Sequence, residues 1–185
     1  MAIDTETTPI DGLILLKPRV FKDARGEFLE TYRDEAMREA GIGKPFVQDN
    51  ISVSRKGTVR GLHYQLPPHG QAKLILAVRG AIWDVAVDLR KGSPTFGLHH
   101  KVLLTEENRH LFYVPVGFAH GFSVLSEEAT VYYKCSGYYE PAAERGVRWN
   151  DADLGIDWGV EEPLVSEKDR VQPLFGEVEA VDLAG

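Results

Sequence analysis

The feature that most constrains the fold is a repeated alternation of short apolar segments with glycine and proline residues. The apolar segments are rich in Val, Ile, Leu, Phe and Tyr, which favour extended backbone. Many short strands separated by turn residues at this spacing are typical of all-β sandwiches and barrels. One helix is predicted at 33–40, ending at Gly41, with Met37 and Ala40 on one face. The predicted strands lie near 12–17, 27–32, 46–54, 58–65, 72–79, 81–89, 98–104, 110–114, 118–125 and 129–136.

Length and composition predict a single domain over residues 1–185. Hydrophobic residues make up 43% of the chain and charged residues 26%, which suits one globular core. The net charge of -7 argues against nucleic acid and anionic membrane as general partners, because both need a basic surface. No apolar run approaches the roughly 18 residues of a membrane span. Cys135 is the only cysteine and the N-terminal segment lacks an apolar signal-peptide core, so we expect a cytoplasmic location.

The clearest hairpin prediction covers residues 72–89, with Arg79 and Gly80 as a two-residue turn. Alternation then places Lys73 on one face with Ile75, Ala77, Ile82, Asp84 and Ala86. In this register Lys73 and Asp84 are diagonal neighbours on adjacent strands. The apolar neighbours favour burial, and a buried lysine needs an acidic partner. An ordinary surface ion pair is the alternative.

Two further strands carry more polar residues than a plain core strand. Arg60 and His63 fall on opposite faces of a regular strand, so they share one pocket only if a bulge near Gly61 resets the alternation. The row Gln48, Asn50, Ser52 and Ser54 is a solvated face if the strand lies at an edge and a pocket wall if it lies inside.

His120 and Tyr133 are the remaining candidates for chemistry. His120 lies between Gly117 and Gly121 and suits a ligand contact, a metal ligand or a structural turn. Tyr133 needs a partner or a role for its hydroxyl if it faces inward with Val131 and Cys135. The sequence contains no phosphate-binding glycine loop, no GxSxG and no zinc spacing. Gln65 and Lys73 stand where a related metal site would hold ligands, and a lysine repels a divalent cation, which raises the question of what chemistry this site serves.

Nine segments spread over most of the chain carry recognisable motifs. They are FKDARGEFLETY at 21–32, VQDNISVS at 47–54, RGLHYQ at 60–65, QAKLI at 71–75, WDVAVDLR at 83–90, GSPTFG at 92–97, GFAHGF at 117–122, YKCSGYY at 133–139 and SEKD at 166–169. Taken together, from about residue 8 to 175, they resemble the dTDP-4-dehydrorhamnose 3,5-epimerase family. The resemblance implies a cupin-type β-sandwich, or jelly roll, that forms homodimers with exchanged N-terminal strands and uses no metal or other cofactor.

The resemblance implies epimerisation of dTDP-4-dehydro-6-deoxy-D-glucose at C3 and C5 through enolates, supplying dTDP-L-rhamnose synthesis. His63 would be the base, oriented by Asp169, and Tyr133 would return a proton from the opposite face. Lys73 would stabilise the enolate oxygen, and Asp84 would keep Lys73 charged and aimed.

The family motifs also imply a set of residues that bind the sugar nucleotide, of which Arg25 and Glu30 would come from the partner subunit. Tyr139 could stack on thymine. Glu27 stands where the family usually has an apolar residue, and Cys135-Ser136-Gly137 replaces a more usual Thr-rich link. The matched positions are Arg25, Glu30, Gln48, Asp49, Asn50, Arg60, His120, Tyr139, Glu144 and Lys168.

Three alternatives remain open at this point. Relatives with the same fold epimerise one carbon of a related dTDP-4-keto-6-deoxy sugar. A metal-dependent cupin oxygenase or isomerase is disfavoured by Gln65 and Lys73. A non-catalytic sugar-nucleotide binder would not need an acid and a base together, which counts against it.

Overall fold

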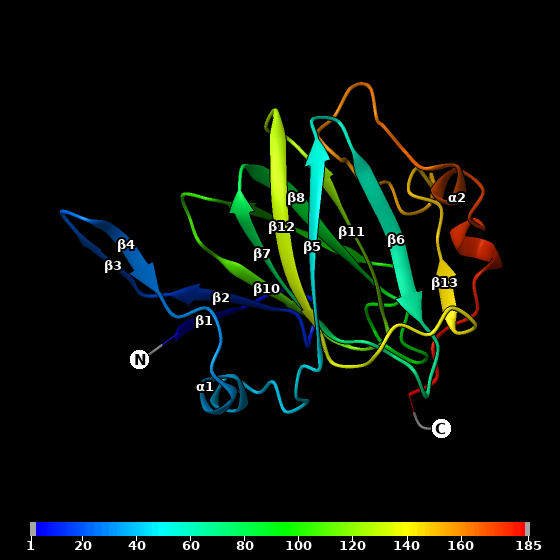
Figure 1. The fold of residues 1–185 in the computed structure, drawn as a ribbon. Coiled ribbons are helices and arrows are strands. Elements are labelled where there is room, and N and C mark those ends of the chain that lie inside the picture. The colour runs from blue at the N-terminus through cyan, green and yellow to red at the C-terminus, as the bar shows by residue number, and fades with distance from the viewer. Residues whose placement is uncertain (1–2, 184–185) are drawn as a thin grey trace.

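Two β-sheets packed face to face form the body of the protein (Figure 1). The computed structural model describes residues 3–183. In this part of the chain the first sheet has the strand order β1-β2-β10-β7-β12-β5 and the second has the order β13-β6-β11-β8-β9. The all-β prediction is therefore confirmed. No helix within residues 3–183 is long and apolar enough to cross a membrane.

The strands of each sheet, the separate hairpin and the helices have the following bounds. The first sheet contains β1 (Ile3–Thr7), β2 (Ile14–Pro18), β10 (Leu111–Val114), β7 (Lys73–Arg79), β12 (Glu128–Cys135) and β5 (Gln48–Arg55). The second contains β13 (Glu144–Gly146), β6 (Val59–Gln65), β11 (Phe118–Val124), β8 (Ala81–Asp88) and β9 (His99–Thr105). The hairpin is β3 (Val20–Asp23) with β4 (Gly26–Leu29), and the helices are α1 (Asp34–Glu39), α2 (Glu167–Arg170) and the 3-10 turn η1 (Phe175–Glu177).

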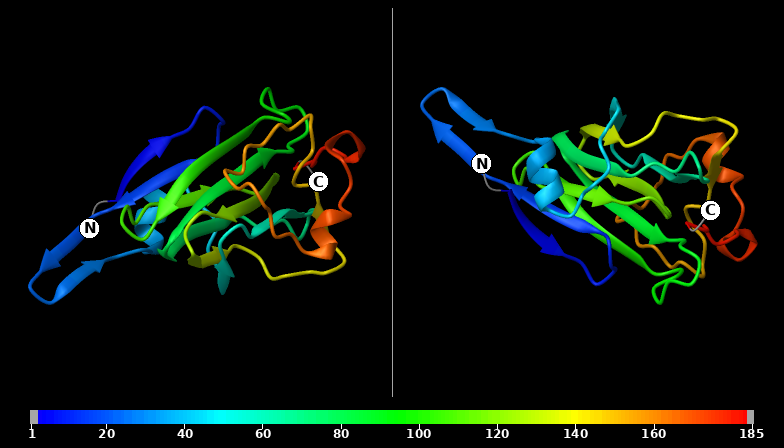
Figure 2. Two further views of the ribbon diagram at one scale, coloured as in Figure 1. Left: turned by 90° about the horizontal axis from the view of Figure 1, so that it is seen from above. Right: turned by 90° about the horizontal axis from the view of Figure 1, so that it is seen from below.

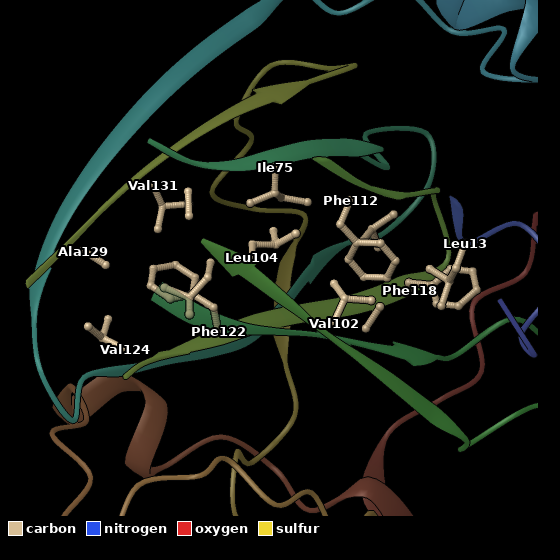
Figure 3. Close-up of a cluster of buried hydrophobic side chains, with 14 of the residues drawn as sticks. Leu13, Ile75, Val102, Leu104, Phe112, Phe118, Phe122, Val124, Ala129 and Val131 are labelled. Carbon is tan, nitrogen blue, oxygen red and sulfur yellow. The ribbon is translucent and has the colours of Figure 1, made fainter. Parts of the chain in front are cut away.

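The main core lies between the two sheets, where alternate side chains of both meet (Figure 3). Phe112, Leu104 and Ile82 are fully buried there. A second cluster on the outside of the β6-β11-β8 sheet is covered by the C-terminal segment through Leu154 and Trp158. The C-terminal segment therefore packs directly against the outside of the second sheet.

The predicted helix is confirmed as α1, one residue shorter at each end. Met37 is buried against the outer face of the first sheet and Ala40 packs beside it. Gly41 follows with φ of 85°, a left-handed conformation that glycine adopts without steric cost and that ends the helix.

The predicted pairing of 72–79 with 81–89 is wrong. The two strands are β7 and β8, and they belong to different sheets. Gly80, with φ of 76°, is the corner between the sheets, and a Cβ there would lie 2.2 Å from the carbonyl oxygen of Glu128. The predicted faces are nevertheless correct, since Ile75, Ala77, Ile82 and Ala86 share one core.

Asp88, at the end of β8, carries an expected stability effect. Burial opposes its ionisation, but hydrogen bonds from Arg90, Ser93 and Thr95 lower its pKa to about 2. A pKa lowered on folding stabilises the protein above the ordinary aspartate pKa, and this stabilisation is lost as the pH falls through 3.8 towards 2. We expect Asp88→Asn to lower the free energy of unfolding by about 2 kcal/mol at pH 7, measured by urea denaturation.

The exposed Asp153 provides the control for this measurement. Asp153→Asn should change stability by no more than about 0.5 kcal/mol. The deficit of Asp88→Asn relative to the unmodified protein should shrink below about pH 4. A deficit that stays constant down to pH 2 would show that the charge of Asp88 contributes nothing.

Candidate active site

Two adjoining cavities open between the sheets, with volumes of about 660 and 290 Å³. Four polar side chains line both cavities: His63, Lys73, His120 and Tyr133. His63 and His120 come from β6 and β11 of one sheet, whereas Lys73 and Tyr133 come from β7 and β12 of the other. The two histidines therefore face the lysine and the tyrosine across the space between the sheets.

A bulge in β6 brings Arg60 and His63 to the same cavity. His63 pairs with His120, but Arg60 pairs with Phe122, so three steps along β6 match two along β11. The extra residue resets the alternation, as the sequence required near Gly61. A Cβ on Gly61 would lie 2.7 Å from Cα of Gly121, so the two strands approach too closely for a side chain there.

His63 is held by a carboxylate from the C-terminal segment. Its Nε2 lies 2.5 Å from Oδ1 of Asp169 in α2. The backbone N–H of Asp169 donates to Ser166 Oγ, and that of Gly61 donates to Asp169 Oδ2. Burial opposes the charge of Asp169, but its hydrogen bond with His63 lowers its pKa overall. The second ring nitrogen of His63 bonds to no described residue, which leaves it available to take a proton from a ligand.

A second His–carboxylate pair lies beside Lys73. His120 Nε2 is 2.8 Å from Asp84 Oδ1. Asp84 is fully buried, and its Oδ2 has no hydrogen-bond partner among the described residues. Burial lowers the pKa of His120, against the effect of Asp84. Asp84 is thus paired directly with His120, rather than with Lys73 as the hairpin register predicted.

Lys73 and Tyr133 lie opposite the histidines. The amino group of Lys73 forms no ion pair with another described residue. Burial lowers the pKa of Lys73, while the charges of Cys135, Asp84 and Glu144 raise it. Burial raises the pKa of the Tyr133 hydroxyl, against the positive charge of Arg60, so the phenol keeps its proton at neutral pH. Lys73 has no hydrogen bond to another described residue, and its ammonium is free to meet an anionic oxygen.

Most of the predicted substrate-binding residues also line the cavities. Gln48, Asn50, Tyr139 and Glu144 lie around the smaller one. Arg60 and Lys168 line the larger one, and His120 lines both. The polar row of β5 therefore faces inward, although β5 is an edge strand.

Hydrogen bonds connect these binding positions. Glu144 Oε2 accepts from Tyr139 Oη at 2.7 Å and from Lys168 Nζ at 2.5 Å. Arg60 Nε donates to Ser54 Oγ at 3.0 Å, which fixes the guanidinium at the cavity wall.

Three predicted binding residues are not brought to the cavities within this chain. Asp49 points outward from β5 and pairs with Lys134 at 2.7 Å. Arg25 lies in the turn of the β3–β4 hairpin, paired with Asp23, and Glu30 follows that hairpin. Glu27, on the same hairpin, forms an ion pair with Arg109.

The sequence reasoning placed Ile75 on the face of Lys73 and Val131 on the face of Tyr133, but it did not assign them to the apolar part of the larger cavity. Ile75, Phe122 and Val131 line it, and each lies two positions from Lys73, His120 or Tyr133 on the same strand. Strand alternation alone was sufficient to place them on the same face. Among residues 3–183, no group of three or more His, Cys, Asp or Glu side chains is placed to hold a metal ion.

Comparison with known proteins identifies the family. The model of the family described as dTDP-4-dehydrorhamnose 3,5-epimerase matches residues 7–177. A Shigella flexneri protein of that name is 48% identical, over 88% of this chain and 90% of its own length.

Two crystal structures give the same result. That of the dTDP-4-dehydrorhamnose 3,5-epimerase from Elizabethkingia anophelis has a TM-score of 0.92, with 46% identity over 96% of this chain and 98% of the other. That of a Legionella pneumophila epimerase in complex with dTDP-4-keto-L-rhamnose also has a TM-score of 0.92, with 43% identity over 96% and 95%. The chain belongs to the dTDP-4-dehydrorhamnose 3,5-epimerase family, whose fold is the cupin-type β-sandwich described above.

Proposed function

We propose that the chain epimerises C3 and C5 of dTDP-4-dehydro-6-deoxy-D-glucose, giving dTDP-4-dehydro-L-rhamnose. The C4 ketone acidifies the protons on both neighbouring carbons, because each resulting carbanion is an enolate. Inversion then needs a base on one face of the sugar, an acid on the other and a positive charge near the C4 oxygen.

The observation that carries the proposal is the placement of His63 and Tyr133 on opposite sheets of one cavity, with Lys73 beside them. His63, oriented by Asp169 at 2.5 Å, takes the proton. Tyr133, protonated at neutral pH, returns one from the opposite face. The ammonium of Lys73 stabilises the enolate oxygen, and the buried Asp84 favours its charged form.

The same arrangement supports roles for the other cavity residues in binding the sugar nucleotide. Arg60 and Lys168 supply positive charge for the diphosphate. Gln48, Asn50 and Glu144 offer donors and acceptors in the smaller cavity, and the exposed ring of Tyr139 suits stacking on thymine.

The direct test is incubation with dTDP-4-dehydro-6-deoxy-D-glucose in heavy water, followed by mass spectrometry and NMR of the sugar. We expect deuterium at C3 and at C5, with inversion at both. Deuterium at one carbon only would favour a single-site epimerase, which is the alternative function. No exchange would overturn the proposed activity.

We further propose a homodimer with exchanged N-terminal strands, in which Arg25, Glu30 and Asp49 join the site between subunits. The outer face of β5 supports this, because Val47, Ile51 and Val53 expose apolar surface there. The β3–β4 hairpin projects beyond the two main sheets (Figure 2), and Phe28 on it is 61% exposed. A second copy of the chain would cover both surfaces.

Ile51→Lys tests the dimer. Ile51 is 68% exposed in the single chain, so the substitution leaves the fold intact but places a charge in the proposed interface. We expect a shift from dimer to monomer in light scattering, with at least a tenfold loss of activity. Leu98→Lys, at another exposed apolar position, is the control and should remain a dimer. A dimeric Ile51→Lys would contradict this interface.

A further inference from the structure

An apolar side of the larger cavity lies between the two sheets and consists of Phe122 from β11, Ile75 from β7 and Val131 from β12. Further apolar lining comes from Val59 and from Leu164 and Val165 of the C-terminal segment. The charged or polar groups that line the cavity include Arg60, His63, Lys73, Lys168 and Asp169. The cavity therefore combines charged groups with an apolar side between the sheets.

The strands fix this apolar side next to the reacting groups. Phe122 is two residues from His120, Val131 two from Tyr133 and Ile75 two from Lys73, each on the inward face. Tyr133 and Ile75 are also direct cross-strand partners. Figure 3 shows Phe122 rising from one sheet towards Val131 and Ile75 on the other.

Packing makes this apolar side rigid. Ile75 has no exposed surface, Val131 has almost none and Phe122 keeps 5% of its surface exposed. All three side chains line the cavity, and the Phe122 ring, which keeps the most exposed surface, is the main part of the surface that a ligand meets there. Because these side chains offer no hydrogen bond, a hydroxyl placed against them would lose its partners in water.

The proposed substrate has one apolar substituent, the C6 methyl group, and it is bonded to C5, one of the two reacting carbons. We propose that Phe122, supported by Ile75 and Val131, is a specificity-determining residue that binds the C6 methyl group and so places C5 at the base. This inference rests on the proposed function. Its consequence is a site that favours 6-deoxy sugars and uses the methyl contact for C5 more than for C3.

The test compares deuterium uptake at C5 and C3 in Phe122→Leu. With the 6-deoxy substrate in heavy water, we expect C5 uptake to fall about tenfold relative to C3 uptake, because the methyl group loses its flat contact surface. Phe112→Leu is the matched control, since Phe112 is buried in the same cluster but lines neither cavity. It should leave the C5-to-C3 ratio within twofold of that of the unmodified protein.

A second pair of variants addresses selectivity without changing side-chain volume. The unmodified protein should prefer the 6-deoxy substrate to dTDP-4-dehydroglucose, its 6-hydroxy analogue, by about 10²-fold in kcat/KM. Val131→Thr should reduce that preference below about tenfold, whereas Val124→Thr, in the same core but away from the cavities, should preserve it.

The outcomes separate the two hypotheses. Equal losses at C3 and C5 in Phe122→Leu, or an unchanged preference in Val131→Thr, would overturn the methyl-binding role while leaving the epimerase intact. Absence of exchange in the unmodified protein would instead overturn the proposed function on which the inference rests.

Discussion

Replacing His63 by Asn is expected to lower turnover about 10³-fold while leaving dTDP affinity within threefold. Asn removes the basic ring nitrogen that faces the cavity, but its side chain can still bond to Asp169. The folded structure and the nucleotide contacts at Tyr139 and Glu144 should therefore be preserved. Single-turnover assays in heavy water and calorimetric titration with dTDP measure the two quantities separately.

The control for this variant is His69→Asn, because His69 is exposed and lines neither cavity. It should have normal turnover. Asp169→Asn should show an intermediate loss, since His63 remains but loses the carboxylate that orients it. Retention of more than a tenth of the activity by His63→Asn would rule out His63 as the base.

Replacing Lys73 by Gln is expected to lower kcat by about 10² to 10³-fold. The positive charge is needed chiefly when the C4 oxygen becomes an enolate, so the effect on KM should be small. Gln can still donate a hydrogen bond, and the loss therefore measures the charge. Lys101→Gln, on β9 and paired with Asp157 away from the cavities, should retain full activity. Equal kcat values for Lys73→Gln and the unmodified protein would exclude enolate stabilisation by Lys73.

The pH dependence of kcat should reveal the effect of Asp84 on the pKa of Lys73. Lys73 acts while protonated; burial already lowers its pKa, and the negative charge of Asp84 partly offsets that effect. Asp84→Asn removes the offset, so the alkaline limb of the kcat profile should move to lower pH. A loss of activity that is equal at every pH would indicate that Asp84 acts only through packing.

Alternation along the strands predicted which residues face inward, but not which strands pair. Residues 72–89 show the difference, because Arg79-Gly80 reads as a hairpin turn and yet joins two sheets at a corner. Period-two patterning fixes the face of a side chain, whereas pairing depends on partners distant in sequence. The strands β1, β3 and β13 were missed because all three are short and none has a run of alternating apolar residues.

A residue of the candidate site was predictable wherever a single strand contained both its sequence motif and the alternation that fixes which way its side chain points. Lys73, His120 and Tyr133 lie in such strands, and the phase change at Gly61 follows from requiring Arg60 and His63 in one cavity. The contact of Asp169 with His63 spans 106 residues, and no periodic pattern encodes it; only family resemblance placed it. Arg25, Glu30 and Asp49 lie apart from the cavities of the single chain, and only the proposed dimer would bring them to a site.

Under the proposed function, the base and the acid come from different sheets, so the distance between those sheets would be part of the catalytic geometry. Facing sheets are kept about 10 Å apart by the side chains that fill the space between them. Leu104 and Phe112, which are buried in this core and line neither cavity, would therefore act as spacers between the sheets. Substitutions of Leu104 or Phe112 would alter the distance between base and acid before they unfold the protein. The loops at the rim of the cavity remain free to vary. In such a scaffold, substitutions that change the substrate specificity are then expected at the mouth of the cavity, while the distance between the two sheets stays constant.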